Sequence, residues 1–124
     1  MEPRVINLEE KASLIQEAQK YKLIAELNDY QLKLVRGAKR EFVWHSHPET
    51  DELFFIVQGR MQIAFRDRVF ILNKGELLVV PKGVEHRPNY YDNEECVVML
   101  IEPRGTVNTG NAGGPMTDTE LEWI

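Results

Sequence analysis

From residue 30 onward, short stretches of alternating apolar and polar residues dominate the chain, and turn-forming residues separate them. Alternation with a period of two is typical of β-strands that bury one face. The expected strands are residues 30–36, 41–47, 52–57, 61–65, 69–72, 77–80, 85–88 and 95–102. The pattern shows no helical segments that could connect parallel strands. It therefore predicts an antiparallel all-β fold, either a sandwich or a barrel.

The first residues have a different pattern. Asn7 precedes Leu8, Glu9 and Glu10, and an asparagine at such a position is typical of a helix N-cap. The helix that follows is expected to be short. Residues 22–27 fit either a strand or a helix, and Asn28 with Asp29 then predicts a turn.

The length of 124 residues is typical of one domain, within which the pattern indicates three parts. We expect an N-terminal helical and extended arm at 1–28, a β-barrel at 29–104 and a C-terminal tail at 105–124. The tail is rich in Gly, Asn and Thr, so we expect it to be a loop that packs on the barrel. Trp123 and Ile124 could anchor its end.

The expected strand at 52–57 is apolar on both faces after Glu52. One face can fill the interior of the barrel. The other face needs a cover, which could be the edge of the opposing sheet, the N-terminal segment or a second subunit. On this ground we predict a homodimer.

Composition and charge exclude several classes of partner. The net charge is −5 and the isoelectric point is about 5.2, which argues against a nucleic-acid surface. No apolar run reaches the roughly 18–20 residues that cross a membrane, and residues 1–4 lack the apolar core expected of a secretory signal. Cys96 is the single cysteine, so an internal disulfide is impossible and a cytoplasmic location is expected.

Three histidines and one glutamate are the candidate metal ligands. His45 and His47 are two residues apart, so in a strand both imidazoles point to one face. The connection at 48–51 can return Glu52 to the same interior through a hairpin, and His86 comes from a distant strand. Three imidazoles and one carboxylate suit one divalent transition metal ion per chain, such as Fe, Mn, Ni, Cu or Zn.

Each of these residues also has a less specific interpretation. A His-x-His pair alone is often structural, and the matched spacing of Glu52 and His86 is what favours a metal site. The nearby acidic residues Glu49 and Asp51 are more typical of solvated turn residues than of replacements for Glu52.

Two longer motifs carry a resemblance to a known family. The run His45-x-His47-x4-Glu52-x6-Gly59 is followed by Gly75-x5-Pro81-x-Gly83-x2-His86. This pair of motifs resembles the cupin superfamily. The flanking runs 41–45 and 102–110 are similar to those of small single-domain cupins labelled as similar to mannose-6-phosphate isomerase. The resemblance implies a jelly-roll-like β-barrel with metal ligands at the four positions named above. The chain departs from the family pattern at Lys39, where a glycine is usual, and in the early position of Asn89.

The sequence leaves the function open among three hypotheses. One is a metal-dependent enzyme that acts on a small organic molecule, as a dioxygenase or as an isomerase, epimerase or lyase, with Glu52 as a catalytic base. The second is a non-catalytic module that binds a small ligand or the metal, and the third is a structural barrel. Val43, Phe54 and Ile56 are the expected apolar pocket wall. A phosphosugar substrate would need converging cations, for which Arg36, Arg60, Arg66 and Lys82 are the candidates.

Overall fold

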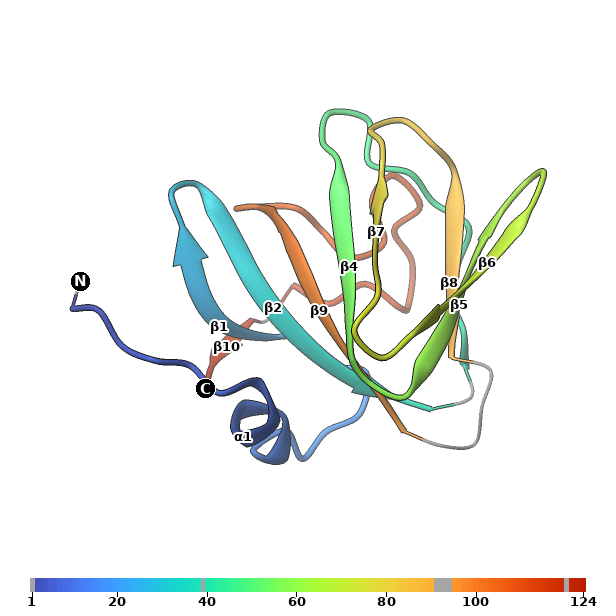
Figure 1. Ribbon diagram of the computed structural model, residues 1–124. Helices are drawn as coiled ribbons and strands as arrows, with labels where there is room; N and C mark the ends of the chain where they lie inside the picture. The colour runs from blue at the N-terminus through green and yellow to red at the C-terminus, as the bar shows by residue number, and fades with distance from the viewer. Residues whose placement is uncertain (1, 39, 91–94, 120) are drawn as a thin grey trace.

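The computed structural model describes residues 2–38, 40–90, 95–119 and 121–124, so Lys39 lies outside the described residues (Figure 1). One short helix and ten strands are found in these segments. They are α1 (Leu8–Ser13), β1 (Lys22–Leu27), β2 (Tyr30–Gly37), β3 (Arg40–Glu41), β4 (Glu52–Gln58), β5 (Arg60–Phe65), β6 (Val69–Asn73), β7 (Leu77–Val80), β8 (His86–Tyr90), β9 (Cys96–Pro103) and β10 (Glu122–Trp123).

The strands form two stacked sheets (Figure 1). The larger sheet has the order β10-β1-β2-β9-β4-β7 and the smaller has the order β3-β8-β5-β6. All strand pairs are antiparallel except β1 with β10. The all-β, jelly-roll-like fold predicted from the sequence is confirmed. Within the described residues, however, the hydrogen-bonded strands form two separate sheets and not one closed barrel.

Two apolar clusters stabilise these layers. The first lies between the sheets and consists of Val35, Phe54, Ile56, Met61, Ile63, Leu72, Val80, Cys96, Val98 and Leu100. The second lies on the outer face of the larger sheet, beneath α1, and contains Ala12, Ile15, Ile24, Leu34 and Val97. Burial of one large aliphatic side chain stabilises a fold by about 1.5–3 kcal/mol, so both clusters contribute strongly.

The N-terminal segment follows the sequence prediction closely. The side chain of Asn7 caps α1 by accepting a hydrogen bond of 3.0 Å from the backbone N–H of Glu10. Residues 22–27, which fitted either a strand or a helix, form β1 and pair with β2. The expected turn follows, with Asn28 in the left-handed region at a φ of 53°.

Strand β2 has its polar positions facing the interior, the reverse of the usual arrangement. Gln31 and Lys33 are 8% and 2% exposed, while Leu34 is fully buried in the second cluster beneath α1. The helix therefore covers the apolar face of the strand, and the polar face turns toward the space between the sheets. Alternation alone identified the strand correctly but could not decide which face is inside.

The strand predicted at 41–47 is shorter than expected. Regular pairing with β8 ends at Glu41. Phe42 still donates a backbone hydrogen bond of 3.3 Å to the carbonyl oxygen of Pro88, and an isolated bridge between His45 and His86 follows. Glu41 pairs with Asn89, so one extra residue is accommodated before the bridge, as in a β-bulge. Pro88 of β8 faces this point and has no backbone N–H to continue the ladder.

The C-terminal tail is not only a loop. Its residues 122–123 form β10, which pairs in parallel with Lys22 and Leu23 of β1. Ile124 donates a backbone hydrogen bond of 3.1 Å to Leu23 and packs on the second cluster. Trp123 stays 53% exposed, so the backbone pairing and Ile124 anchor the tail more than Trp123 does.

The outer face of β4 is covered in part by the N-terminal segment. Val57 packs against the cluster beneath α1, while Leu53 and Phe55 are half-buried. This accounts for some of the apolar surface on which we based the homodimer, which stays a prediction. No helix in the described part of the chain has both the length and the apolar composition to cross a membrane.

We expect Ile15→Ala to lower the free energy of unfolding by about 2–5 kcal/mol, because Ile15 is fully buried and its loss leaves a cavity. The neighbouring change Leu14→Ala is the matched control, since Leu14 is 54% exposed, and should stay within about 0.5 kcal/mol. Chemical denaturation of both variants measures the difference. Equal losses would contradict the assignment of this cluster as a core.

Candidate metal centre

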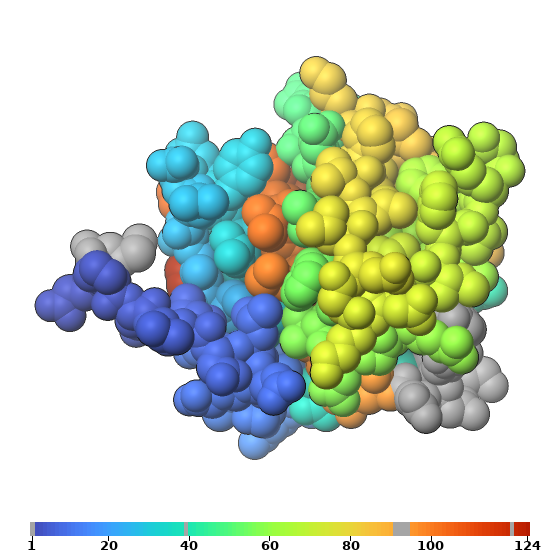
Figure 2. All heavy atoms as spheres, viewed as in Figure 1, coloured from blue at the N-terminus to red at the C-terminus, as the bar shows by residue number. Residues whose placement is uncertain are grey.

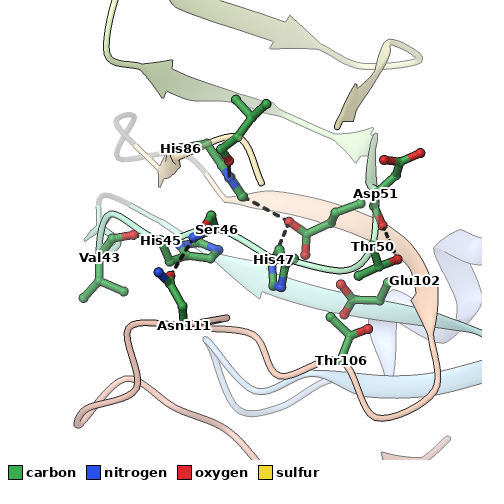
Figure 3. A network of polar contacts seen from close by, with 12 residues as sticks. Val43, His45, Ser46, His47, Thr50, Asp51, His86, Glu102, Thr106 and Asn111 are labelled. Carbon is green, nitrogen blue, oxygen red and sulfur yellow. Dashed lines mark hydrogen bonds and ion pairs between the residues drawn. The ribbon is translucent and has the colours of Figure 1, made fainter. Parts of the chain in front are cut away.

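The four candidate ligands converge at one buried point. His45, His47, Glu52 and His86 each offer a donor atom, and these atoms all lie within 4.8 Å of one another. All four side chains are at most 5% exposed. Figure 3 shows the labelled histidines directed toward a common centre from different parts of the chain.

The convergence takes place across the two sheets. His45 bridges to His86 of β8 in the smaller sheet, whereas Glu52 begins β4 in the larger sheet. The hairpin that we predicted between His47 and Glu52 is therefore wrong, because the connection at 48–51 crosses from one layer to the other. The bulge before His45 matters here, since an extra residue reverses which side chains point inward. Trp44 consequently lies on the outside, with the guanidinium carbon of Arg66 3.9 Å from its ring centroid.

Backbone carbonyls orient two of the imidazoles. Nδ1 of His45 lies 2.9 Å from the carbonyl oxygen of Val43, and Nδ1 of His86 lies 3.0 Å from that of Val84. A carbonyl can only accept, so each Nδ1 must carry the proton and donate it. In a neutral ring Nε2 is then left with its lone pair. This orientation is the one that metal-binding histidines commonly have.

The carboxylate of Glu52 lies among the imidazoles. Its Oε1 is 3.1 Å from Nε2 of His86 and 3.2 Å from Nε2 of His47. Burial alone would raise the pKa of Glu52, but hydrogen bonds with His47 and His86 outweigh this and hold that pKa below its usual range. Burial lowers the pKa of His45 to about 4, so this imidazole is neutral at pH 7.

This donor set fits a cation. With Nδ1 of His86 donating to Val84, a neutral His86 presents a bare Nε2 to a carboxylate oxygen 3.1 Å away. Two acceptors so close require a proton or a metal ion between them. In addition, Nε2 of His47 is buried and has no well-formed hydrogen bond within the described residues. Three nitrogens and one carboxylate oxygen are suited to a borderline divalent transition metal.

Two charged residues beside this centre were not predicted from the sequence. Lys33 and Glu102 are 2% and 1% exposed and form an ion pair of 2.9 Å. Burial and the neighbouring carboxyl group of Glu52 raise the pKa of Glu102, against the opposing effect of Lys33. Both residues stand at polar positions of alternating strands, which usually face solvent, so the sequence held no direct signal for them. Figure 3 shows Glu102 between His47 and Thr106.

The expected pocket residues have three different environments. The ring centroid of Phe54 lies 6.1 Å from that of His86, and Phe54 lines a narrow interior cavity of about 20 Å³. Val43 is half-buried and orients His45 through its carbonyl oxygen. Ile56 is fully buried in the core between the sheets. The other cavity residues are Gln19, Tyr21, Arg40, Phe42, Met61, Pro88, Tyr90, Val98 and Leu100.

Two open grooves are lined in part by candidate ligands. One groove of about 580 Å³ is lined by His47, Tyr30, Thr50, Arg104 and Thr106, together with Pro48, Glu49, Pro103, Gly105, Val107 and Gly110. A second groove of about 390 Å³ is lined in part by Glu52. Both volumes are within the range typical of small-molecule sites.

The C-terminal tail fixes the segment that carries His45 and His47. Asn111 donates its backbone N–H to the carbonyl oxygen of Ser46, and its side-chain oxygen accepts from the N–H of Ser46, at 3.0 and 2.8 Å. Gly110 lies so close that an added Cβ would be 2.2 Å from the Ser46 oxygen and 3.2 Å from Cδ2 of His45. From the sequence we expected this tail to be a loop that packs on the barrel.

Comparison with known proteins agrees with this architecture. Residues 33–102 match the family model described as a cupin domain. The crystal structure of a cupin-2 domain containing protein from Shewanella frigidimarina NCIMB 400 is 52% identical, with a TM-score of 0.75, over 81% of this chain and 95% of that chain.

More distant similarities extend the comparison. The uncharacterized protein YdbB of Bacillus subtilis strain 168 is 38% identical over 69 residues, which are 55% of this chain and 60% of that protein. A Ralstonia eutropha JMP134 structure described as a candidate mannose-6-phosphate isomerase has a TM-score of 0.64 over 82% of this chain and 98% of that chain. Its 18% identity supports a shared fold alone.

We expect Gly110→Ala to destabilise the protein by at least about 2 kcal/mol more than Gly113→Ala, because an alanine Cβ at position 110 collides with backbone. Gly113 is the matched control, since its φ of 63° is also left-handed but nothing lies within 4 Å of an added Cβ. Gly113→Ala itself should lower the free energy of unfolding by about 1–2 kcal/mol. Thermal unfolding compares the two variants, and a similar loss in both would refute the close contact.

Proposed function

Because the chain belongs to the cupin family and buries three imidazoles and a carboxylate around one point, we propose that it binds one divalent transition metal ion through His45, His47, Glu52 and His86. The close approach of the Glu52 carboxylate to Nε2 of His86 is the observation that carries this proposal. Bound there, such an ion would act as a Lewis acid on a coordinated oxygen atom, and iron, manganese or copper would add redox chemistry.

We further propose that the centre serves an enzyme acting on a small organic molecule. Four protein donors leave room for additional ligands around an ion that accepts five or six. The grooves lined in part by His47 and Glu52 provide access, while Phe54 and Phe42 line the small interior cavity. Glu52 is the one carboxylate of the four-donor cluster, and it is the residue suited to accept a proton from a bound substrate.

The cations around the centre do not separate a phosphosugar from other small molecules. Arg36 pairs with Glu95 and Arg66 with Glu85. Arg104, which pairs with Glu26, lines the groove beside His47, and Lys82 lines the groove beside Glu52. The proposal therefore keeps dioxygenase chemistry and isomerase, epimerase or lyase chemistry as alternatives.

The alternative is a module that binds a small ligand or the metal without catalysis. The buried, fully assembled cluster supports this function equally well, and it does not support a structural barrel that has lost its site. A cytoplasmic location also belongs to our proposal, on the basis of the single buried Cys96.

We expect the purified protein to contain about one divalent transition metal ion per chain, and His47→Ala to lose at least about 90% of it, because one of four donors is removed. Elemental analysis of both proteins measures the content. Trp44→Phe is a suitable control, since Trp44 lies on the outside and its replacement leaves the donors intact. Equal metal content in wild type and His47→Ala would contradict the proposed centre.

We also propose that two chains associate through the edge strands β6 and β7. Val69, Ile71, Leu77 and Val79 are about half exposed there, an unusual density of apolar surface for a monomer. These strands lie on the face that Figure 2 presents in yellow and yellow-green.

We expect the wild-type protein to elute with the mass of a dimer, and Ile71→Lys to shift it to monomer, because a charge cannot be buried unpaired in an apolar interface. Light scattering coupled to size-exclusion chromatography gives the mass. Leu27→Lys serves as control, since Leu27 is 63% exposed on β1, away from these edges. A monomeric wild type would refute this proposal without touching the metal centre.

A further inference from the structure

The narrow interior cavity carries four polar side chains that the proposed function does not use. Gln19, Tyr21, Arg40 and Tyr90 line it together with apolar side chains. The four candidate metal ligands are not among its lining residues. Its volume of about 20 Å³ has room for one small chemical group. The cavity is therefore a separate candidate for ligand binding.

The pairing of β3 with β8 and a glycine bring these side chains together. Arg40 is the Cα partner of Tyr90, and directly opposite residues of an antiparallel pair point to the same face. An added Cβ at Gly37 would lie 2.8 Å from Nε2 of Gln19 and 2.8 Å from Cε2 of Tyr90. The amide and the ring thus meet above Gly37, and the polar groups of separate segments converge on one cavity.

The backbone of Gln19 has a conformation that is unfavourable for a residue with a Cβ. Its φ of 67° lies in the left-handed region. The backbone N–H of Gln19 donates a hydrogen bond of 2.7 Å to the carbonyl oxygen of Arg36, which holds this conformation. The side chain then lies over Gly37 and lines the cavity. Backbone strain of this kind is often found at binding sites.

All four polar groups can donate hydrogen bonds. A guanidinium group has five N–H bonds, an amide has two and each phenol has one O–H. Burial raises the pKa of both Tyr21 and Tyr90, so both phenols keep the proton at neutral pH. Within the described segments, none of the four side chains has a hydrogen bond or an ion pair with another residue. Donors that converge without an acceptor are complementary to an anion.

We propose that this cavity binds the carboxylate group of a small organic anion, with Arg40 as its principal residue. A planar carboxylate accepts two parallel hydrogen bonds from one guanidinium group, and the phenols and the amide supply further donors. Two oxygen atoms also need less room than the four of a phosphate. The site does not depend on the proposed metal binding, because no candidate metal ligand lines the cavity.

Two aromatic rings separate this site from the candidate metal centre. The ring centroid of Phe42 lies 5.4 Å from that of His45, and the ring centroid of Phe54 lies 6.1 Å from that of His86. Both phenylalanines line the cavity. A carboxylate held by Arg40 would therefore lie one aromatic layer away from the candidate ligands and would not replace any of them.

The experiment titrates the protein with sodium acetate at constant ionic strength, both metal-free and with one equivalent of Zn²⁺, and follows binding by NMR. Acetate should bind in both forms and shift the signals of Gly37 and Arg40. Arg40→Gln should weaken binding by at least about tenfold, because the charge and the paired donors are lost. Arg66→Gln is the matched control and should leave the affinity unchanged, since this side chain is 61% exposed and pairs with Glu85.

A second variant tests the site if Arg40→Gln does not fold. Tyr90→Phe keeps the ring and removes only the hydroxyl, so it should weaken acetate binding by about threefold to tenfold. Tyr30→Phe is its control, because Tyr30 is 47% exposed and does not line the cavity.

Four results would overturn the proposal. The first is the absence of saturable acetate binding up to about 100 mM, which would leave the cavity to water alone. The second is wild-type affinity in both Arg40→Gln and Tyr90→Phe. The third is acetate binding that requires Zn²⁺, which would place the anion on the metal centre. The fourth is inorganic phosphate bound as tightly as acetate.

Discussion

The burial of one carboxylate among three imidazoles is the constraint on which the rest of this structure depends. An isolated charge or an unpaired acceptor in an apolar interior is costly, so each of these groups needs a partner. The fold supplies backbone carbonyls for Nδ1 of His45 and His86, and places Oε1 of Glu52 close to two ring nitrogens. The four donor atoms of these side chains converge at a single point. The metal ion that we propose would supply the partner that these groups lack.

Much of the fold could be predicted from the sequence because strands with turn signals are local patterns. The expected strands correspond to β2 and to β4 through β9 within one or two residues, and the Asn7 cap was also correct. The four converging side chains were found because two spaced motifs bring them together. Local patterns did not show how the sheets stack, and so the connection between His47 and Glu52 was misjudged.

The inner polar residues illustrate a second limit of sequence interpretation. Period-two alternation says that two faces differ, but a strand covered on both sides gives no indication of which face is inside. The helix α1 packs on the apolar face of β2 around Leu34. The opposite face, which carries Lys33, therefore points to the interior. The bulge before His45 is equally invisible locally, because it appears only in the pairing with β8, a strand more than 40 residues away.

That bulge has a consequence for how the segment between β3 and His45 can vary. Residues 42–44 can change in identity as long as they fit their surroundings. Their number is fixed, because it determines whether the imidazoles of His45 and His47 point to the interior. An insertion or deletion of one residue here would shift the side-chain phase and turn His45 and His47 toward solvent while leaving every ligand present in the sequence. A related chain with all four ligands but a different spacer would therefore keep the motif and lose the geometry.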